Sequence, residues 1–163
     1  MKSMFSKSSH QPLHVLVVGN NPIEMSTVLE KLHRVKKRKI VTEIAFDIRS
    51  TVERLNTFNP NFILIDDNLG NSELLETINT LSATKKTRHV PITVLKNSNY
   101  RETLPSAGIL DYLLKQNLST ESLYSAIKNS FRLKKTQALL RKFYQQKSGL
   151  FSKLTPKGLD LVS

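Results

Sequence analysis

The feature that most constrains the fold of this chain is the alternation of short apolar runs with segments of helical periodicity. Five runs rich in β-branched and other apolar residues lie at 13–18, 40–46, 62–65, 92–95 and 109–114. Continuous apolar runs of this length are typical of parallel strands that are buried on both faces. The sequence therefore predicts a parallel sheet with a helix in each connection.

Helical spacing of apolar residues marks the connections. The periodic sets are Met25, Val28, Leu29 and Leu32; Val52, Leu55 and Phe58; Leu74, Leu75, Ile78 and Leu81; and Leu123, Ala126, Ile127 and Phe131. Pro22 suits the first turn of a helix, and Ser119 suits the N-cap of the last one. A short polar helix is expected near 99–105. The last helix is expected to continue to about residue 146 and to break at Ser148-Gly149.

Strands that alternate with helices predict an α/β fold, a doubly wound five-stranded parallel sheet with helices on both faces. In such folds the functional site lies beyond the carboxyl ends of the strands. The polar and glycine residues that follow the strands are Gly19, Asn20, Asp66, Asp67, Asn68, Lys96, Asn97 and Lys115. These residues are the candidates for a site.

Composition excludes several classes of site. The 163 residues include no cysteine, so disulfides and thiolate metal sites are excluded. The four histidines have no metal-ligand spacing and are expected to have no function. No apolar run reaches the ~18 residues of a membrane-spanning helix, and no apolar stretch follows the first residues, so we expect no secretory signal and a cytoplasmic protein without membrane contact. The net charge is +12, and residues 127–163 hold nine Lys or Arg against one Asp.

Four segments carry a resemblance to a known family. They are Val15-Leu16-Val17-Val18 with the following Asn-Pro turn, Asn59-Pro60-Asn61-Phe62-Ile63-Leu64-Ile65-Asp66-Asp67-Asn68-Leu69-Gly70, Val90-Pro91-Ile92-Thr93-Val94-Leu95, and Ala107-Gly108-Ile109-Leu110-Asp111-Tyr112-Leu113-Leu114-Lys115. Through them, residues 13–130 resemble a response-regulator receiver domain (CheY-like). The resemblance implies a flavodoxin-like fold with strand order 2-1-3-4-5.

The resemblance also implies roles for individual residues. Asp66 matches the aspartate that accepts a phosphoryl group, and Asn68 matches the position whose backbone carbonyl helps to hold Mg²⁺. Lys115 matches the lysine that pairs with the phosphoryl group. Tyr112 matches the aromatic residue that reports the state of the domain by turning inward or outward.

Two departures from the family alter this pocket. Gly19 and Asn20 stand where the family places a pair of acids for Mg²⁺, and Lys96 stands where it places Thr or Ser. Because Mg²⁺ prefers hard oxygen ligands, the loss of two carboxylates removes most of its binding. We therefore expect a pseudo-receiver in which Lys96 and Lys115 pair with Asp66. An ion pair at ~4 Å in an effective dielectric near 20 contributes roughly 4 kcal/mol before desolvation.

Alternatives remain open. Asp67 is a possible substitute metal ligand, and with an altered metal shell Asp66 could still be phosphorylated; Mg²⁺ is expected as a cofactor only in that case.

The chain divides into an N-terminal arm (1–12), the receiver-like domain (13–130) and a basic helical extension and tail (131–163).

Expected partners are signalling proteins, such as a histidine kinase or an output protein, or a second copy that pairs through the fourth and fifth helices of the domain. Residues 127–157 also suit a basic nucleic-acid-associated regulator. Residues 154–162 faintly resemble the opening of a LuxR-type helix-turn-helix. The chain ends before a recognition helix, so sequence-specific DNA binding is not expected.

Overall fold

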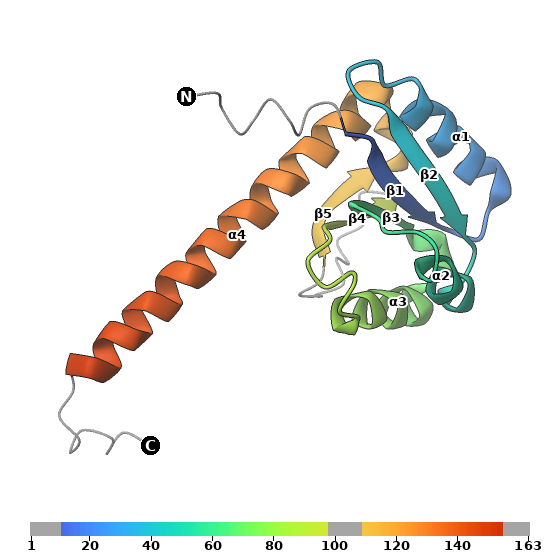
Figure 1. Ribbon diagram of the computed structural model, residues 1–163. Coiled ribbons are helices and arrows are strands. Elements are labelled where there is room, and N and C mark those ends of the chain that lie inside the picture. Colours follow the sequence, from blue (N-terminus) through green and yellow to red (C-terminus); the bar gives the residue numbers. More distant parts are fainter. Residues whose placement is uncertain (1–10, 98–108, 155–163) are drawn as a thin grey trace.

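The computed structural model describes residues 11–97 and 109–154 of the chain. Within these ranges five parallel strands form one sheet in the order β2-β1-β3-β4-β5 (Figure 1). The strands are β1 (Leu13–Val18), β2 (Ile40–Ala45), β3 (Phe62–Asp66), β4 (Ile92–Lys96) and β5 (Ile109–Leu114). The predicted fold class and strand order are confirmed.

Helices cover both faces of the sheet (Figure 1). They are α1 (Pro22–His33), α2 (Ile48–Leu55), α3 (Asn71–Ala83) and α4 (Thr120–Leu154). Helix α1 and the first turns of α4 pack on one face, and α2 and α3 pack on the other. The helix expected near 99–105 lies outside the described residues, as do the N-terminal arm up to residue 10 and all but Leu154 of the helix-turn-helix resemblance.

The alternation of side chains along β3 divides the core into two clusters. Phe62 and Leu64 pack toward α1 and α4, whereas Ile63 and Ile65 pack toward α2 and α3, and all four are fully buried. Successive residues of a strand point to opposite faces, so a central strand needs apolar residues at every position. Asp66, the next residue in this alternation, faces the α1–α4 side.

Capping side chains set where the first two helices begin. The Asn21 Oδ1 accepts hydrogen bonds from the backbone N–H groups of Ile23 (3.1 Å) and Glu24 (3.3 Å), with Pro22 at the first helical position. Helix α1 therefore begins directly beyond β1. Glu24 lies in its first turn, above the carboxyl ends of the strands.

Helix α2 is shorter than its apolar pattern suggests. Its capping box joins Asp47 and Ser50, and the helix ends at Leu55, so Phe58 follows it and packs on the core from the loop. The buried residues of the helix are Thr51 and Leu55, one turn apart. Val52, which helped to mark this helix in the sequence, is 46% exposed.

Helix α4 spans 35 residues and is the longest element of the chain. Ser119 caps it as predicted: its hydroxyl accepts from the Ser122 N–H (3.0 Å), and the Ser122 hydroxyl accepts from the Ser119 N–H (2.8 Å). The predicted break at Ser148-Gly149 is wrong, because the helix continues to Leu154. One interior Gly costs only about 1 kcal/mol relative to Ala, which does not stop a helix.

The contacts of α4 with the core end near residue 131. Ile127 and Ser130 are buried, and Phe131 packs edge-on against Phe62, whereas Leu133 is already 44% exposed. Beyond this point α4 projects from the domain as a single rod (Figure 1). No helix in the described ranges has both the length and the apolar character needed to cross a bilayer.

Candidate functional site

Asp66 forms the floor of a polar pocket at the carboxyl edge of the sheet. It is the last residue of β3 and is only 2% exposed. Its Oδ1 accepts a hydrogen bond from the Asn68 N–H (2.8 Å) and lies 2.5 Å from the Lys115 Nζ. The predicted pairing of Asp66 with Lys115 is therefore present.

Lys115 contacts three carboxylates. It begins the 3-10 turn η2 (Lys115–Asn117) after β5, and its Nζ lies 2.9 Å from the Glu24 Oε2 and 3.8 Å from the Asp67 Oδ1, besides its contact with Asp66. It also donates to the Asn97 Oδ1 (3.0 Å). The sequence suggested one acid facing two amines. The structure has the opposite balance, one ammonium among three acids.

Lys96 points toward the other face of the sheet. Its Nζ lies 5.0 Å from the centre of the Tyr112 ring, a cation–π distance. The reason is strand alternation: Leu95 is the register partner of Asp66 and packs on the α1–α4 side, so the next residue turns to the α2–α3 side. The prediction that Lys96 joins Lys115 at Asp66 is therefore wrong.

Glu24 is the functional residue that the sequence reasoning missed. It belongs to α1, whereas only residues following strands were considered. Its Oε2 accepts from the Asn68 Nδ2 (2.7 Å) as well as from Lys115. The signal was present in the sequence, because an Asn-Pro cap three residues earlier fixes Glu24 in a first helical turn beside the site.

Three asparagines connect the acids of the pocket. The Asn97 side chain donates to the Asn68 Oδ1 (2.5 Å), and the Asn97 backbone N–H donates to the Asp67 Oδ2 (3.2 Å). Asn20 donates from Nδ2 to the backbone carbonyl of Asn68 (3.1 Å). The carbonyl that the family resemblance assigns to Mg²⁺ therefore accepts an amide N–H.

An acidic side chain at position 19 would require the Met25 side chain to move. A Cβ at position 19 would lie 2.5 Å from the Met25 Sδ and 3.0 Å from the Asp66 Cβ. Met25 is 1% exposed and belongs to the core cluster beneath α1 and α4. The thioether thus occupies the volume into which a first carboxylate after β1 would extend.

Burial and charge act in opposite directions on the two central groups. Burial raises the pKa of Asp66 above its ordinary value, and Glu24 adds to the rise, while Lys115 and the Asn68 N–H oppose it. Burial alone would lower the pKa of Lys115, but hydrogen bonds to Asp66 and Glu24 outweigh it and raise this pKa. Lys115 is therefore held firmly in its charged form.

Tyr112, the predicted switch aromatic, lies half-buried in β5. It packs against the core cluster on the α2–α3 side, with Lys96 over its ring. Burial raises the pKa of its phenol. Tyr112 and Lys96 thus form a pair of their own, on the opposite face of the sheet from Asp66.

The donor set does not fit Mg²⁺. Within residues 11–97 and 109–154, no three Asp, Glu, His or Cys side chains are placed to hold a metal ion. The Asp67 Oδ1 is buried without a hydrogen bond, but it faces the Lys115 ammonium rather than other oxygen ligands. The carboxylate oxygens converge on the Lys115 ammonium, and the Asn68 carbonyl is engaged by Asn20, so these oxygens are not available as Mg²⁺ ligands.

A small hollow of about 140 Å³ opens beside the pocket, between α1 and η2. Its lining residues are Glu24, Thr27, Val28, Lys31, Asp66, Lys115 and Leu118. Lys31 donates to the backbone carbonyl of Leu118 (2.8 Å) and links α1 to the segment that precedes α4. Helix α1 is therefore linked to the Asp66–Lys115 pair through Glu24 and to the segment before α4 through Lys31.

Comparison with known proteins shows which fold this is. No family model matches the chain, and none of the curated proteins matches it. One similar solved structure is the receiver domain of sensor histidine kinase PA1611 from Pseudomonas aeruginosa, which has Mg²⁺ in its active-site cleft. Its sequence is 20% identical to this chain, and the TM-score is 0.62. The match covers 74% of this chain and 98% of that one. CheY4 of Vibrio cholerae is 17% identical with a TM-score of 0.61, covering 74% and 99%. The chain has the CheY-like receiver fold.

Proposed function

We propose that this protein is a pseudo-receiver, an intracellular signalling module of the two-component or phosphorelay type that acts through protein–protein contact. In this proposal Asp66 takes up neither Mg²⁺ nor a phosphoryl group. The Lys115 ammonium supplies the positive charge that a divalent cation supplies in a working pocket. The partner is a histidine kinase or an output protein that recognises one fixed conformation.

The observation that carries this proposal is the position of Met25. Its Sδ would lie 2.5 Å from a Cβ at position 19, so a side chain at that position requires the buried thioether to move. The family needs a carboxylate near this position for its metal. Phosphoryl transfer depends on that metal to neutralise developing charge.

Incubation with a small phosphodonor and Mg²⁺, followed by intact-mass measurement, tests the proposal. We expect no gain of a phosphoryl mass by the natural chain. Asp66→Asn is the matched control, because any gain that persists in this variant comes from another site. A stoichiometric gain that Asp66→Asn abolishes would refute the pseudo-receiver.

A second variant tests whether restoring the family residues restores phosphorylation at Asp66. Gly19→Asp, Asn20→Asp and Lys96→Thr restore the family residues, and Met25→Ala provides the volume that a carboxylate at position 19 requires. We expect this fourfold variant to gain mass at Asp66. The same set without Met25→Ala should gain less, because the thioether still blocks position 19.

A phosphorylatable receiver is the second candidate, and Glu24 is the observation that favours it. Its carboxylate lies 2.9 Å from Lys115 at the same pocket and supplies an acid from α1 in place of those missing after β1. If the natural chain gains a phosphoryl mass, Glu24→Gln should abolish the gain. A gain that survives this substitution would exclude Glu24 as the replacement acid.

A further inference from the structure

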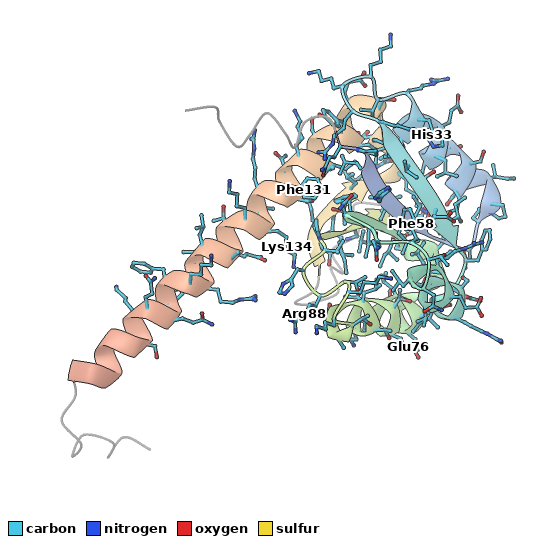
Figure 2. All side chains as sticks on the ribbon, viewed as in Figure 1. His33, Phe58, Glu76, Arg88, Phe131 and Lys134 are labelled. Carbon is cyan, nitrogen blue, oxygen red and sulfur yellow. The ribbon has the colours of Figure 1, made fainter. Side chains whose placement is uncertain are left out.

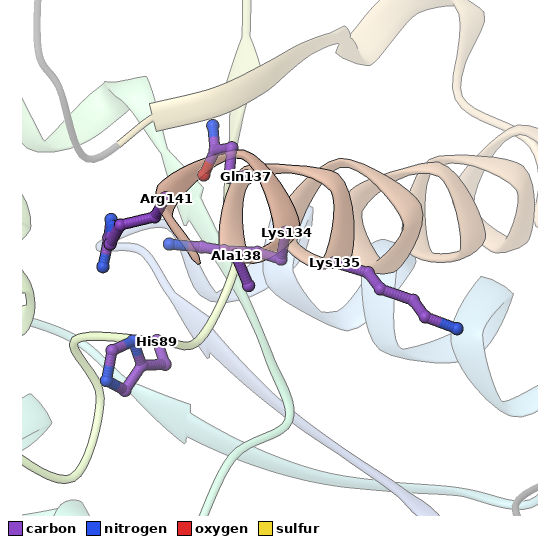
Figure 3. A pocket seen from close by; sticks show the side chains of 6 residues that line it. All are labelled: His89, Lys134, Lys135, Gln137, Ala138 and Arg141. Carbon is purple, nitrogen blue, oxygen red and sulfur yellow. The ribbon is translucent and has the colours of Figure 1, made fainter. Parts of the chain in front are cut away.

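A second hollow lies outside the receiver pocket, where α4 leaves the domain. Its volume is about 270 Å³ (Figure 3). The lining residues are His89 from the loop between α3 and β4, and Lys134, Lys135, Gln137, Ala138 and Arg141 from α4. Figure 2 shows Arg88 on the side of the domain toward α4 and Lys134 on the side of α4 toward the domain.

The lining offers hydrogen-bond donors and no carboxylate. Lys134 and Arg141 are two turns apart on one face of α4, and Figure 3 shows both side chains extending toward the same end of the hollow, above His89. Arg88 donates from Nε to the His89 Nε2 (3.1 Å). This bond makes Nε2 the acceptor, so the neutral ring carries its proton on Nδ1. His89, set aside in the sequence reasoning, therefore contributes an N–H.

The charges of Lys134 and Arg141 lack a compensating acid. Burial lowers the pKa of Lys134, and the nearby Arg141 lowers it further. In the part of the chain that the structure describes, neither side chain has a carboxylate within ion-pair distance. A bound anion would relieve this repulsion and accept charge-assisted hydrogen bonds from both groups.

The lining favours a phosphate group over a whole nucleotide or another organic ligand. Ala138 is the only apolar side chain among the described residues that line the hollow, and the His89 imidazole is the only ring among them that could stack on a base. Pockets for small organic ligands are lined mainly by apolar groups.

The charge beyond the hollow favours a chain of phosphates over a single one. Other exposed basic residues of α4 do not line the hollow; these are Arg132, Lys142 and Lys147. Nine Lys or Arg against one Asp in residues 127–163 would match repeated phosphate groups.

We propose that His89, Lys134 and Arg141 form a phosphate-binding site, and that α4 holds the sugar–phosphate backbone of duplex DNA against it. The contact positions the duplex without reading its sequence, because each of the groups named meets phosphate rather than base edges. This inference is independent of the proposed function, since no residue of the Asp66 pocket takes part.

The proposed DNA contact is tested by fluorescence anisotropy with the full chain and a labelled mixed-sequence duplex of about 20 base pairs, over a range of salt concentrations. The test variant is Lys134→Gln with Arg141→Gln. The matched control is Lys142→Gln with Lys147→Gln, which removes the same charge from the same helix at positions that do not line the hollow. We expect the test variant to bind the duplex about tenfold more weakly than the natural chain. The slope of log K against log salt should decrease in magnitude by about two.

The control variant should lose less than about threefold, and His89→Ala should weaken binding by an intermediate amount. Equal losses in the test and control variants would overturn the site, since they would mean a diffuse attraction to the whole helix. Failure of the natural chain to bind the duplex at low salt would also overturn it. Binding of inorganic pyrophosphate or of anionic lipid vesicles in place of the duplex would overturn the assignment to DNA. Circular dichroism verifies that each variant keeps its helix content.

Discussion

Lys115 is the residue on which the polar contacts of the receiver pocket converge. Its side chain is 14% exposed, and it contacts acids from α1, from β3 and from the turn after β3. A buried charge is tolerated only where partners compensate for its lost hydration. The sequence thus positions a cation of its own in the pocket.

Removal of this ammonium should destabilise the fold. Lys115→Met leaves Asp66 buried and uncompensated, so we expect the free energy of unfolding to fall by about 3 kcal/mol. Urea denaturation followed by circular dichroism measures the change.

A double-mutant cycle separates the ion pair from simple packing. Asp66→Asn in the Lys115→Met background removes the orphaned charge and should recover more than half of the lost stability. If the double variant is as unstable as the sum of the single variants, the two side chains do not interact.

Alkaline pH should weaken the same contact. The folded-state pKa of Lys115 is raised above its ordinary value of 10.5, so its stabilising contribution is complete below that pH and is lost as pH rises through the folded value. The difference in unfolding free energy between the natural chain and Lys115→Met should therefore shrink as the pH rises above about 10.5. Tyr112 titrates in both proteins and cancels. A difference that stays constant over this range would contradict the assignment.

At the residue scale, the sequence predicts which side chains meet at the ends of the strands. It does not predict as well which side chains reach the pocket from other elements. Asp66 and Lys115 lie at the carboxyl ends of strands in one parallel sheet, so their meeting follows from topology. Glu24 reaches the pocket from a helix, and its contact depends on the cap at Asn21. Lys96 was misplaced because its position after a strand was considered without the alternation of side chains along that strand.

At the scale of elements, the sheet and most helices could be predicted because buried strands need continuous apolar runs. The length of α4 could not, because Gly149 was interpreted as a stop. An interior Gly raises the free energy of a helix without capping it, and Gly149 has open space around its Cα. Neighbouring helical residues on both sides carry the helix through it.

Gly149→Ala should therefore strengthen α4 rather than disturb it. Ala lowers the free energy of a helix interior by about 1 kcal/mol relative to Gly, and nothing lies within 4 Å of the added Cβ. We expect higher helix content by circular dichroism and slower amide exchange in the last turns. Gly149→Pro is the opposing variant and should shorten the helix. Unchanged exchange in the Ala variant would mean that this part of the helix is not limited by Gly149.

At the scale of the whole molecule, the projecting part of α4 carries apolar side chains with no covering element in the described structure. Those exposed are Leu133, Leu139, Leu140, Phe143 and Tyr144. We expect two copies of the chain to pair through this face at high concentration, with the polar residues at the rim.

Sedimentation velocity over a concentration series checks this expectation. Leu140→Ser with Phe143→Ser should shift the protein toward the monomer, because both side chains are about half exposed in the single chain. Thr136→Ser with Gln145→Asn changes polar residues of the same helix and should leave the association unchanged. A natural chain that sediments as a monomer at every concentration would contradict pairing.

The length of α4 also has a mechanical consequence. A rigid helix of 35 residues is about 50 Å long at 1.5 Å per residue. Its first turns are packed in the core through Leu123, Ile127 and Phe131, so about 35 Å of the helix projects beyond residue 131. A tilt of about 10° at that point would sweep the far tip through roughly 6 Å, given the same rise per residue. The domain therefore has a lever arm, which amplifies a sub-ångström adjustment at its base into a motion that a bound partner could register.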